Sequence, residues 1–455
     1  MQLNAADFGN DFHWGVSSSA YQTEGAYLED GKGISIWDIF TALPGKVHKG
    51  QNANVACDFY HRYIQDIILM QYLGIKNFRF SISWTRILPE GTGKINDLGI
   101  DFYDRLIDFC LESGIRPWAT LYHWDLPYAL EQKGGWTNRD IIHWFGEFID
   151  VCIRKYSDRV KDWMVLNEPL VFTGAGYFLG LHAPGRKCLA NFLPAVHHAA
   201  LCQALGAARI KSYDHSLQVG STFSCAHIDP IDKTRTSIEA AQRMDALTNR
   251  LFIEPLIGLG YPSKELKVLH QLEKYMRDGD EQRLCFDMDF IGLQNYTREV
   301  VRYSPVMPYT NARLVKASKR NMPHTSMDWE IYPKSIYNLL KKFDSYKKFP
   351  QFIITENGAA FDDRVVNGQV DDQPRIDFYQ SYLEQVLRAA REGVNVKGFF
   401  AWSFTDNFEW SEGYKPRFGL VYIDYYTQKR IIKSSGFWYK NFLNREFWLS
   451  HARAS

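Results

Sequence analysis

The sequence predicts a single (β/α)8 barrel domain spanning residues 1–455, with an active site at the carboxyl ends of its strands. Three observations support this prediction. Eight short apolar segments recur along the chain, segments with helical spacing lie between them, and many of the apolar segments end in polar or aromatic residues. Strands that alternate with helices indicate a parallel sheet, and α/β barrels often exceed the usual size of one domain.

The eight expected strands are mostly continuous apolar runs, which is typical of a parallel sheet covered on both faces. In chain order they are "FHWGVS" near residue 12, "NFRFSIS" from 77, "RPWATLY" from 116, "WMVLN" from 163, "QVGSTFS" from 218, "DFIGLQNY" from 289, "QFIIT" from 351 and "VKGFFAWS" from 396. Between them, "IDFYDRLIDFCLESG" (100–114) and "RIDFYQSYLEQVLRAAREG" (375–393) have helical spacing. Each of these two segments ends in glycine, as a helix C-terminus often does.

Composition and charge narrow the class of function. The formal net charge is +1, which gives no electrostatic reason to expect nucleic acid or a membrane surface as partner. No apolar run approaches the roughly 20 residues needed to span a bilayer. Aromatic residues reach 15%, and besides filling the core such residues serve as platforms for sugar rings. The sequence leaves the oligomeric state open.

The seven cysteines are widely spaced and form no C-x-x-C pair, so neither a disulfide framework nor a zinc site is expected. The first residues lack the basic and apolar regions of a signal peptide, and a cytoplasmic location is therefore expected. No cofactor or metal is expected either, because the chain has no phosphate-binding glycine-rich loop and no H-E-x-x-H spacing.

Two of the expected strands deliver a glutamate at their ends. "WMVL" runs into Asn167 and Glu168, and "FIIT" runs into Glu356. A solvated strand end is the simpler interpretation of either residue alone, since burying a carboxylate is costly unless it is paired. In a barrel, however, the carboxyl ends of all strands meet at one mouth, so Glu168 and Glu356 are expected to converge there.

Two glutamates in an aromatic-rich cleft are the minimum set of catalytic groups for glycoside hydrolysis. Arg79, if it points inward from the second strand, would hold Glu356 ionised by charge pairing. Tyr296 could donate a hydrogen bond to the same carboxylate. Glu168 has only the neutral Asn167 beside it in sequence and could retain its proton. The expected roles are therefore Glu356 as nucleophile and Glu168 as acid/base.

Several segments together resemble the family 1 glycoside hydrolases, the retaining β-glucosidase family. They are "NEP", "TENG", "FHWGVSSSAYQTEG", "RFSISWTRILP", "LYHWDLP" and "WSFTDNFEW" with "RFGLVYID", and the resemblance runs from about residue 8 to about residue 445. It implies that the glutamate of "NEP", Glu168, is the acid/base and that of "TENG", Glu356, is the nucleophile. It also implies a small β-glycoside or oligosaccharide as substrate.

The resemblance also implies which residues hold the sugar. Those expected to hydrogen-bond the hydroxyl groups of the sugar that is cleaved off are Gln22, His123, Asn167, Glu409 and Trp410. Trp402 matches the platform under that sugar, and Trp329 matches a stacking residue on the leaving-group side. Each has a structural alternative: a hydrogen-bonded core histidine for His123, a core side chain for Trp402, a loop brace for Trp329, a solvated side chain for Gln22 and an ordinary ion pair for Arg79.

The sequence departs from the family pattern at a few positions. Gln294-Asn295-Tyr296 stands where the family usually has Asn-Tyr-Tyr, Leu170 where many relatives carry a larger aromatic, and Ser224 where asparagine is common. Leu170 and Ser224 lie toward the leaving-group side and bear on leaving-group preference. Other polar residues are interpreted as structural: Asp125, Asp162, Asp406 and the pair His197-His198.

Three functions remain as hypotheses. The first is a retaining, exo-acting β-glucosidase that also accepts β-galactosides or β-fucosides, with a role in cellulose degradation. The second is a 6-phospho-β-glycosidase, which Glu409 argues against because a carboxylate there would face a phosphate. The third is a non-catalytic carbohydrate-binding relative. Such proteins typically have one of the two glutamates replaced, and both are present here.

Overall fold

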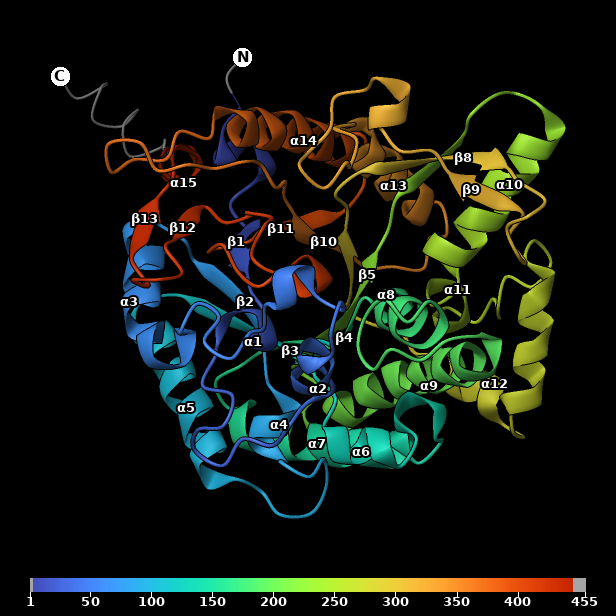
Figure 1. Ribbon diagram of the computed structural model, residues 1–455, viewed down its shortest axis with the longest axis horizontal. Coiled ribbons are helices and arrows are strands. Elements are labelled where there is room, and N and C mark those ends of the chain that lie inside the picture. Colours follow the sequence, from blue (N-terminus) through green and yellow to red (C-terminus); the bar gives the residue numbers. More distant parts are fainter. Residues whose placement is uncertain (1–2, 445–455) are drawn as a thin grey trace.

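Eight parallel strands close into a barrel in the computed structural model, which describes residues 3–444 (Figure 1). In chain order they are β1 (His13–Ser17), β2 (Asn77–Ser81), β3 (Arg116–Tyr122), β4 (Asp162–Asn167), β5 (Gln218–Ser224), β7 (Phe290–Gln294), β10 (Phe352–Asn357) and β11 (Val396–Trp402). Neighbours in this order are paired, and β11 returns to pair with β1. The predicted barrel, and each of its eight predicted strands, is confirmed.

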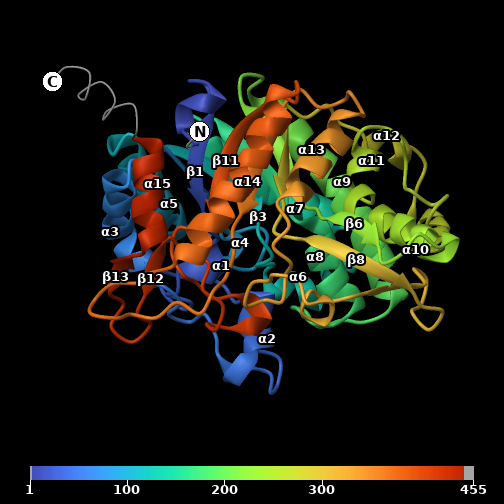
Figure 2. The same cartoon turned by 90° about the horizontal axis from the view of Figure 1, so that it is seen from above.

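The long helices lie around the outside of the barrel (Figures 1 and 2). They are α3 (Phe59–Tyr72), α5 (Asp97–Glu112), α7 (Ile141–Tyr156), α9 (Leu189–Tyr213), α13 (Lys334–Asp344), α14 (Gln373–Arg391) and α15 (Ser434–Leu443). The two helices expected from the sequence form as α5 and α14. The glycines that follow them, Gly114 and Gly393, have positive φ angles of 70° and 92°. Glycine adopts that conformation without steric cost, which makes it suitable just beyond a helix end.

Short helices occupy the connections between the strands and the long helices. They are α1 (Ala20–Thr23), α2 (Ile36–Ala42), α4 (Trp84–Ile87), α6 (Tyr128–Gln132), α8 (Pro169–Thr173), α11 (Ile253–Leu256) and α12 (Asp280–Arg283). Within residues 3–444, no helix combines the length and the apolar character that crossing a membrane requires.

Large side chains fill the barrel interior. One buried cluster contains Trp118, Met164, Phe290, Ile353 and Phe400, each from a different barrel strand. The neighbouring strand β5 makes room for it with Gly220, where a Cβ atom would lie 2.4 Å from the Phe290 ring. Such close packing makes the barrel a solid support, so the residues at its mouth are held by a rigid base.

Two small sheets lie outside the barrel. One contains β6 (His227–Pro230), β8 (Arg298–Tyr303) and β9 (Ala312–Leu314), and it packs against α10 (Arg235–Asp245). Figure 2 shows β8 and α10 extending to one side of the barrel strands. The other is the pair β12 (Val421–Ile423) and β13 (Arg430–Ile432), which follows the last barrel strand. Neither sheet was expected from the sequence.

Candidate active site

A cavity of about 380 Å³ opens where the barrel strands end. Among its lining residues are most of the side chains that the sequence singled out: Gln22, His123, Glu168, Tyr296, Trp329, Glu356, Trp402, Glu409 and Trp410. Arg79 and Asn167 are fully buried beside the cavity and reach it through their neighbours. The structure therefore brings together residues that are up to 388 positions apart in the chain.

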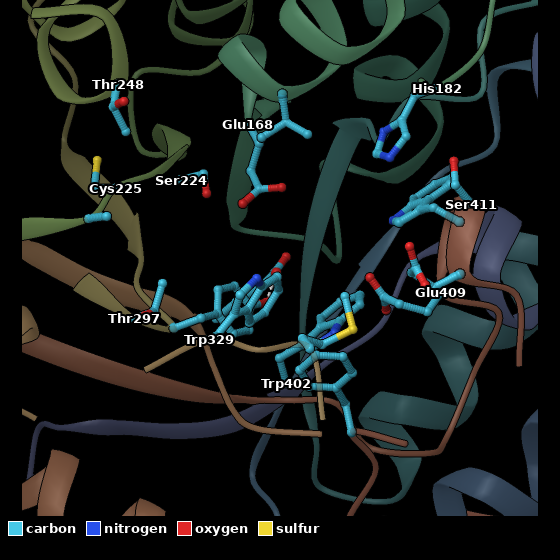
Figure 3. A pocket seen from close by; sticks show the side chains of 18 of the residues that line it. Glu168, His182, Ser224, Cys225, Thr248, Thr297, Trp329, Trp402, Glu409 and Ser411 are labelled. Atoms are coloured by element: carbon cyan, nitrogen blue, oxygen red, sulfur yellow. Dashed lines mark hydrogen bonds between the residues drawn. The ribbon is translucent and has the colours of Figure 1, made fainter. Parts of the chain in front are cut away.

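The backbone at Glu168 turns this side chain into the cavity. The residue follows β4 and has φ 47° and ψ 64°, in the left-handed region, and Pro169 starts α8 directly after it. Its N–H donates to the Thr222 carbonyl of β5 over 2.9 Å. A positive φ at a residue other than glycine is uncommon, and it persists only where the surroundings impose it. Figure 3 shows the Glu168 carboxyl group pointing into the middle of the cavity.

Two of the glutamates that line the cavity, Glu168 and Glu356, have different partners. Glu356 accepts hydrogen bonds from the Arg79 guanidinium and from the Tyr296 hydroxyl, the latter at 2.5 Å. Burial raises the pKa of Glu356, but Arg79 and Tyr296 both oppose that rise. Burial and the Glu356 charge raise the pKa of Glu168 to about 8, with only partial opposition from Ser224 and Arg79. At neutral pH the proton of this pair therefore resides on Glu168.

Asn167 links Arg79 to His123 behind the cavity. Its side-chain oxygen accepts hydrogen bonds from Arg79 at 2.6 Å, Gln294 at 2.8 Å and Thr222 at 2.9 Å. With the oxygen fixed as acceptor, the Asn167 amide nitrogen donates to His123 Nε2 at 3.0 Å. Burial and the Arg79 charge lower the pKa of His123, so the ring is neutral and its proton lies on Nδ1. Nδ1 is buried without a partner among residues 3–444.

One end of the cavity is formed by the loop that follows β11. Gln22 ties this loop to the loop after β1, because its amide donates to the Phe408 carbonyl at 2.9 Å and to Glu409 at 3.5 Å. Burial and the Glu356 charge raise the pKa of Glu409 to about 8. The sequence analysis treated Glu409 as an ionised carboxylate, whereas these surroundings favour the protonated form at neutral pH. The Gln22 amide donors are already engaged, and its oxygen accepts from the Ser19 hydroxyl at 2.7 Å, which leaves one acceptor position on that oxygen for a further contact.

Three tryptophans form aromatic walls. Trp402 is 4% exposed and packs in one cluster with Trp329 and Phe418. In Figure 3, Trp402 and Trp329 lie across the cavity from Glu168. Trp410 packs against Trp124, with 4.5 Å between the ring centroids. Flat rings on one side of a cavity and carboxyl groups on the other suit a sugar, which has apolar faces and a rim of hydroxyl groups.

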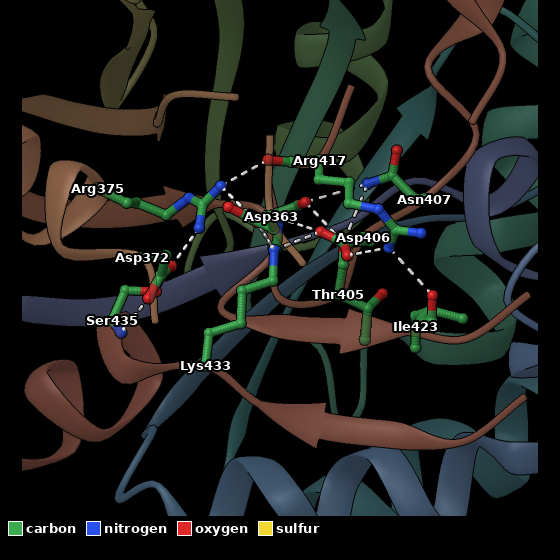
Figure 4. Close-up of polar contacts among 12 residues, drawn as sticks. Asp363, Asp372, Arg375, Thr405, Asp406, Asn407, Arg417, Ile423, Lys433 and Ser435 are labelled. Atoms are coloured by element: carbon green, nitrogen blue, oxygen red, sulfur yellow. Dashed lines mark hydrogen bonds and ion pairs between the residues drawn. The ribbon is translucent and has the colours of Figure 1, made fainter. Parts of the chain in front are cut away.

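A buried ionic network anchors the loop that carries Glu409 (Figure 4). Asp406 pairs with Arg417 and Lys433, each at 2.6 Å, and accepts a bond from the Gly419 N–H at 3.0 Å. The network continues to Asp363, Asp372 and Arg375, so that three acidic and three basic side chains are balanced. The structural interpretation of Asp406 is confirmed. So is that of His197, which is buried and bonded to Asp280 at 2.9 Å.

Sequence reasoning missed part of the cavity lining. His182 lies near Ser411 at the same end as Glu409, and Thr248, Cys225 and Thr297 lie on the other side of Glu168 (Figure 3). Further lining residues on that other side come from α10 and the small outer sheet: Met244, Glu299 and Leu314. These residues sit in connections between barrel strands, where no periodic pattern marks them.

Comparisons with known proteins agree with this geometry. The model of glycosyl hydrolase family 1 matches residues 4–447. Beta-glucosidase A of Thermotoga maritima is 43% identical over 96% of this chain and 98% of its own length. A 1,4-beta-D-glucan glucohydrolase of Thermotoga neapolitana is 45% identical over 95% of this chain and 97% of its own length.

Solved structures give the same result. A family 1 β-glucosidase from Thermotoga maritima superimposes with a TM-score of 0.92 at 44% identity, covering 95% of this chain and 97% of that one. A structure of the Thermotoga maritima β-glucosidase in complex with glucoimidazole superimposes with a TM-score of 0.91. The match spans the barrel and the loops that carry both cavity glutamates. The chain belongs to glycosyl hydrolase family 1.

Proposed function

We propose that the protein is a retaining, exo-acting β-glucosidase, built as one catalytic domain, with Glu356 as nucleophile and Glu168 as acid/base. One observation carries this proposal: the two buried glutamates have unequal surroundings. Glu356 is held by a guanidinium and a phenol hydroxyl, whereas burial and a neighbouring charge keep the proton on Glu168. A pair of carboxyl groups whose pKa values are pushed apart is what acid–nucleophile catalysis requires.

In the first step, a Glu356 carboxylate oxygen forms a bond to the anomeric carbon as the bond from that carbon to the leaving oxygen breaks. Glu168 gives its proton to the leaving oxygen, so the alcohol departs neutral. The negative charge of Glu356 is consumed in the ester, and this removes the charge that raised the pKa of Glu168. Glu168 is therefore a stronger acid in the glycosyl-enzyme than in the free enzyme.

In the second step, the deprotonated Glu168 takes a proton from water while the water oxygen attacks the anomeric carbon. The ester bond to Glu356 breaks, and the carboxylate returns to its contacts with Arg79 and Tyr296. Two inversions at the same carbon give net retention. Tyr296 and Arg79 stabilise the departing carboxylate, since both donate to its oxygens.

We assign recognition of the cleaved sugar to Gln22, His123, Glu409 and Trp410, with Asn167 fixing the ring of His123. The unpartnered Nδ1–H of His123 is a donor, and the Glu409 carboxyl group is both donor and acceptor at neutral pH. Trp402 supplies a platform, and Trp329 is placed beside the leaving group. The packed aromatic side chains behind Trp410 close this end of the cavity, which supports attack on a terminal sugar.

The substrates we propose are β-D-glucosides, with β-galactosides and β-fucosides as further substrates. The Thermotoga neapolitana relatives are named 1,4-beta-D-glucan glucohydrolase, and this supports a role in cellulose degradation. The seven unpaired cysteines support a cytoplasmic location. The alternatives are not favoured. The relatives from Thermotoga maritima and Acetivibrio thermocellus are named beta-glucosidase, which argues against a 6-phospho-β-glycosidase. A non-catalytic relative would not need both Glu168 and Glu356.

Proton NMR of the first product tests this function. With p-nitrophenyl β-glucoside, we expect β-glucose to appear first and to convert slowly to the α form. Retention also requires carboxyl groups about 5–5.5 Å apart. Initial formation of α-glucose would contradict the double-displacement mechanism. Faster cleavage of the 6-phosphorylated glucoside would contradict the choice of substrate.

A further inference from the structure

The wall of the cavity on the far side of Glu168 from Glu409 is formed by elements that lie outside the barrel. Its wall includes Met244 at the end of α10, Thr248 just after it and Leu314 on β9. Figure 3 places Thr248 and Thr297 on the opposite side of Glu168 from Glu409. Because the cleaved sugar is assigned to the Glu409 end, this outer wall faces the leaving group.

One ionisable side chain stands out in this wall. Glu299 lines the cavity from β8, and it lies on the same face of the strand as Thr297, two residues earlier. Its neighbour Arg298 points to the opposite face, where it pairs with Glu330 at 2.8 Å and Asp229 at 2.8 Å. Successive residues of β8 therefore point to opposite faces: Arg298 forms ion pairs on one face, and Glu299 faces the cavity on the other.

Glu299 has no hydrogen-bond or ion-pair partner in the part of the chain that the structure describes. Arg320, whose charge acts on the pKa of Glu299, is bonded to Glu330 at 2.5 Å instead. Burial raises the pKa of Glu299 to about 7. Glu299 is half-buried, so its carboxyl group reaches the open space of the cavity and is free to accept or donate hydrogen bonds to a ligand there.

The side chains of this wall indicate which kind of ligand would bind there. Met244, Thr248 and Leu314 carry no charge, and a neutral hydroxyl can bond to Glu299 whether the carboxyl group is protonated or not. Along the chain Glu299 is three residues from Tyr296, which is at most about 10 Å of extended backbone. Thr297, two residues before Glu299 on the same strand face, lies on the opposite side of Glu168 from Glu409, so Glu299 belongs to the wall that faces the leaving group.

We propose that Glu299 binds hydroxyl groups of a leaving oligosaccharide, so that the outer wall formed by α10, β8 and β9 selects β-linked gluco-oligosaccharides over short aryl glucosides. This inference rests on the proposed β-glucosidase function and adds a specificity-determining residue to it. Thr297 and Leu314 frame the same wall but lack a group that accepts hydrogen bonds strongly at this position.

The test compares kcat/KM for cellotriose with kcat/KM for p-nitrophenyl β-glucoside, using the full chain. A nitrophenyl group carries none of the hydroxyl groups that Glu299 is proposed to bind, so the ratio of the two values isolates this contact. For E299A we expect this ratio to fall about tenfold or more, as expected for losing a hydrogen bond to an acidic group. For E299Q, which keeps one acceptor, the ratio should fall less than for E299A.

The matched control is E239Q, the same substitution on α10 at a residue that is 43% exposed in its side chain and paired with Arg235. Both kcat/KM values should be unchanged in this variant. An unchanged ratio in both Glu299 variants, or equal losses on both substrates, would overturn the proposal. If the wild-type protein cleaves neither substrate, the β-glucosidase function itself is wrong, so the two failures can be told apart.

Discussion

Removing the hydroxyl group of Tyr296 should shift the pH dependence of catalysis in one direction. This hydroxyl donates to Glu356 at 2.5 Å, and Tyr296→Phe deletes that bond while keeping the ring against Trp329. Hydrogen bonds to charged groups are worth about 1.5–3 kcal/mol. Since one pKa unit corresponds to about 1.4 kcal/mol, the pKa of Glu356 should rise by about one to two units.

The assay is the pH profile of kcat/KM for p-nitrophenyl β-glucoside, which reports the pKa values of the free enzyme. The acidic limb follows ionisation of Glu356, so it should move to higher pH by one to two units in the variant. The basic limb follows loss of the Glu168 proton near pH 8 and should stay in place. Below the shifted limb, activity should fall about 10- to 100-fold.

A matched control separates this effect from a general loss of packing. Tyr177 is another buried tyrosine that donates to a carboxylate, with 2.7 Å between its hydroxyl and Glu131. Tyr177→Phe should lower thermal stability without moving either limb of the profile. An acidic limb that stays at the wild-type position in Tyr296→Phe would refute the role assigned to this hydrogen bond.

Three further substitutions test the remaining assignments. Glu356→Gln should abolish turnover without unfolding the protein, and a 2-fluoro-glucoside should label Glu356 in the wild type; mass spectrometry that finds the label elsewhere would contradict the assignment. Glu168→Ala should spare glycosylation by dinitrophenyl glucoside but slow cellobiose cleavage by about 10²–10⁴, with azide yielding β-glucosyl azide; equal losses on both substrates would argue against an acid role. Glu409→Ala should lower kcat/KM for aryl glucosides more than about tenfold and for aryl fucosides less, because fucose lacks the 6-hydroxyl; equal losses on both sugars would exclude a contact with that hydroxyl.

The barrel could be predicted from the sequence because its strands are buried on both faces. Such strands consist mostly of uninterrupted apolar residues. Segments such as "WMVLN" and "QFIIT" can therefore be recognised as strands without knowing which strands they pair with. The outer sheet could not be predicted in the same way. Its strand β6 has four residues of intermediate burial, and β9 has one buried residue followed by two exposed ones, so neither carries a continuous apolar run. These strands are stabilised by neighbours that are distant in sequence.

The site was predictable to a different extent. The positions of Glu168 and Glu356 followed from strand ends, and the family resemblance indicated the sugar-facing residues. The partners of Asn167 did not follow, because Arg79 and Gln294 reach it from other strands. The protonation state of Glu409 also could not be predicted from the sequence, because it depends on burial and on the charge of Glu356, which lies on another strand.

The closure of the barrel has a consequence for how the chain is made. The last strand pairs with the first, residue 398 beside residue 13, so β1 lacks this neighbour until almost the whole chain exists. At 5–20 residues per second, a ribosome leaves that edge unpaired for roughly 20–80 s. An apolar strand with a free edge is a template for aggregation. A nascent chain that stops before Val396 would expose two such edges, on β1 and on β10, and would also lack the loop that holds Glu409 and Trp410.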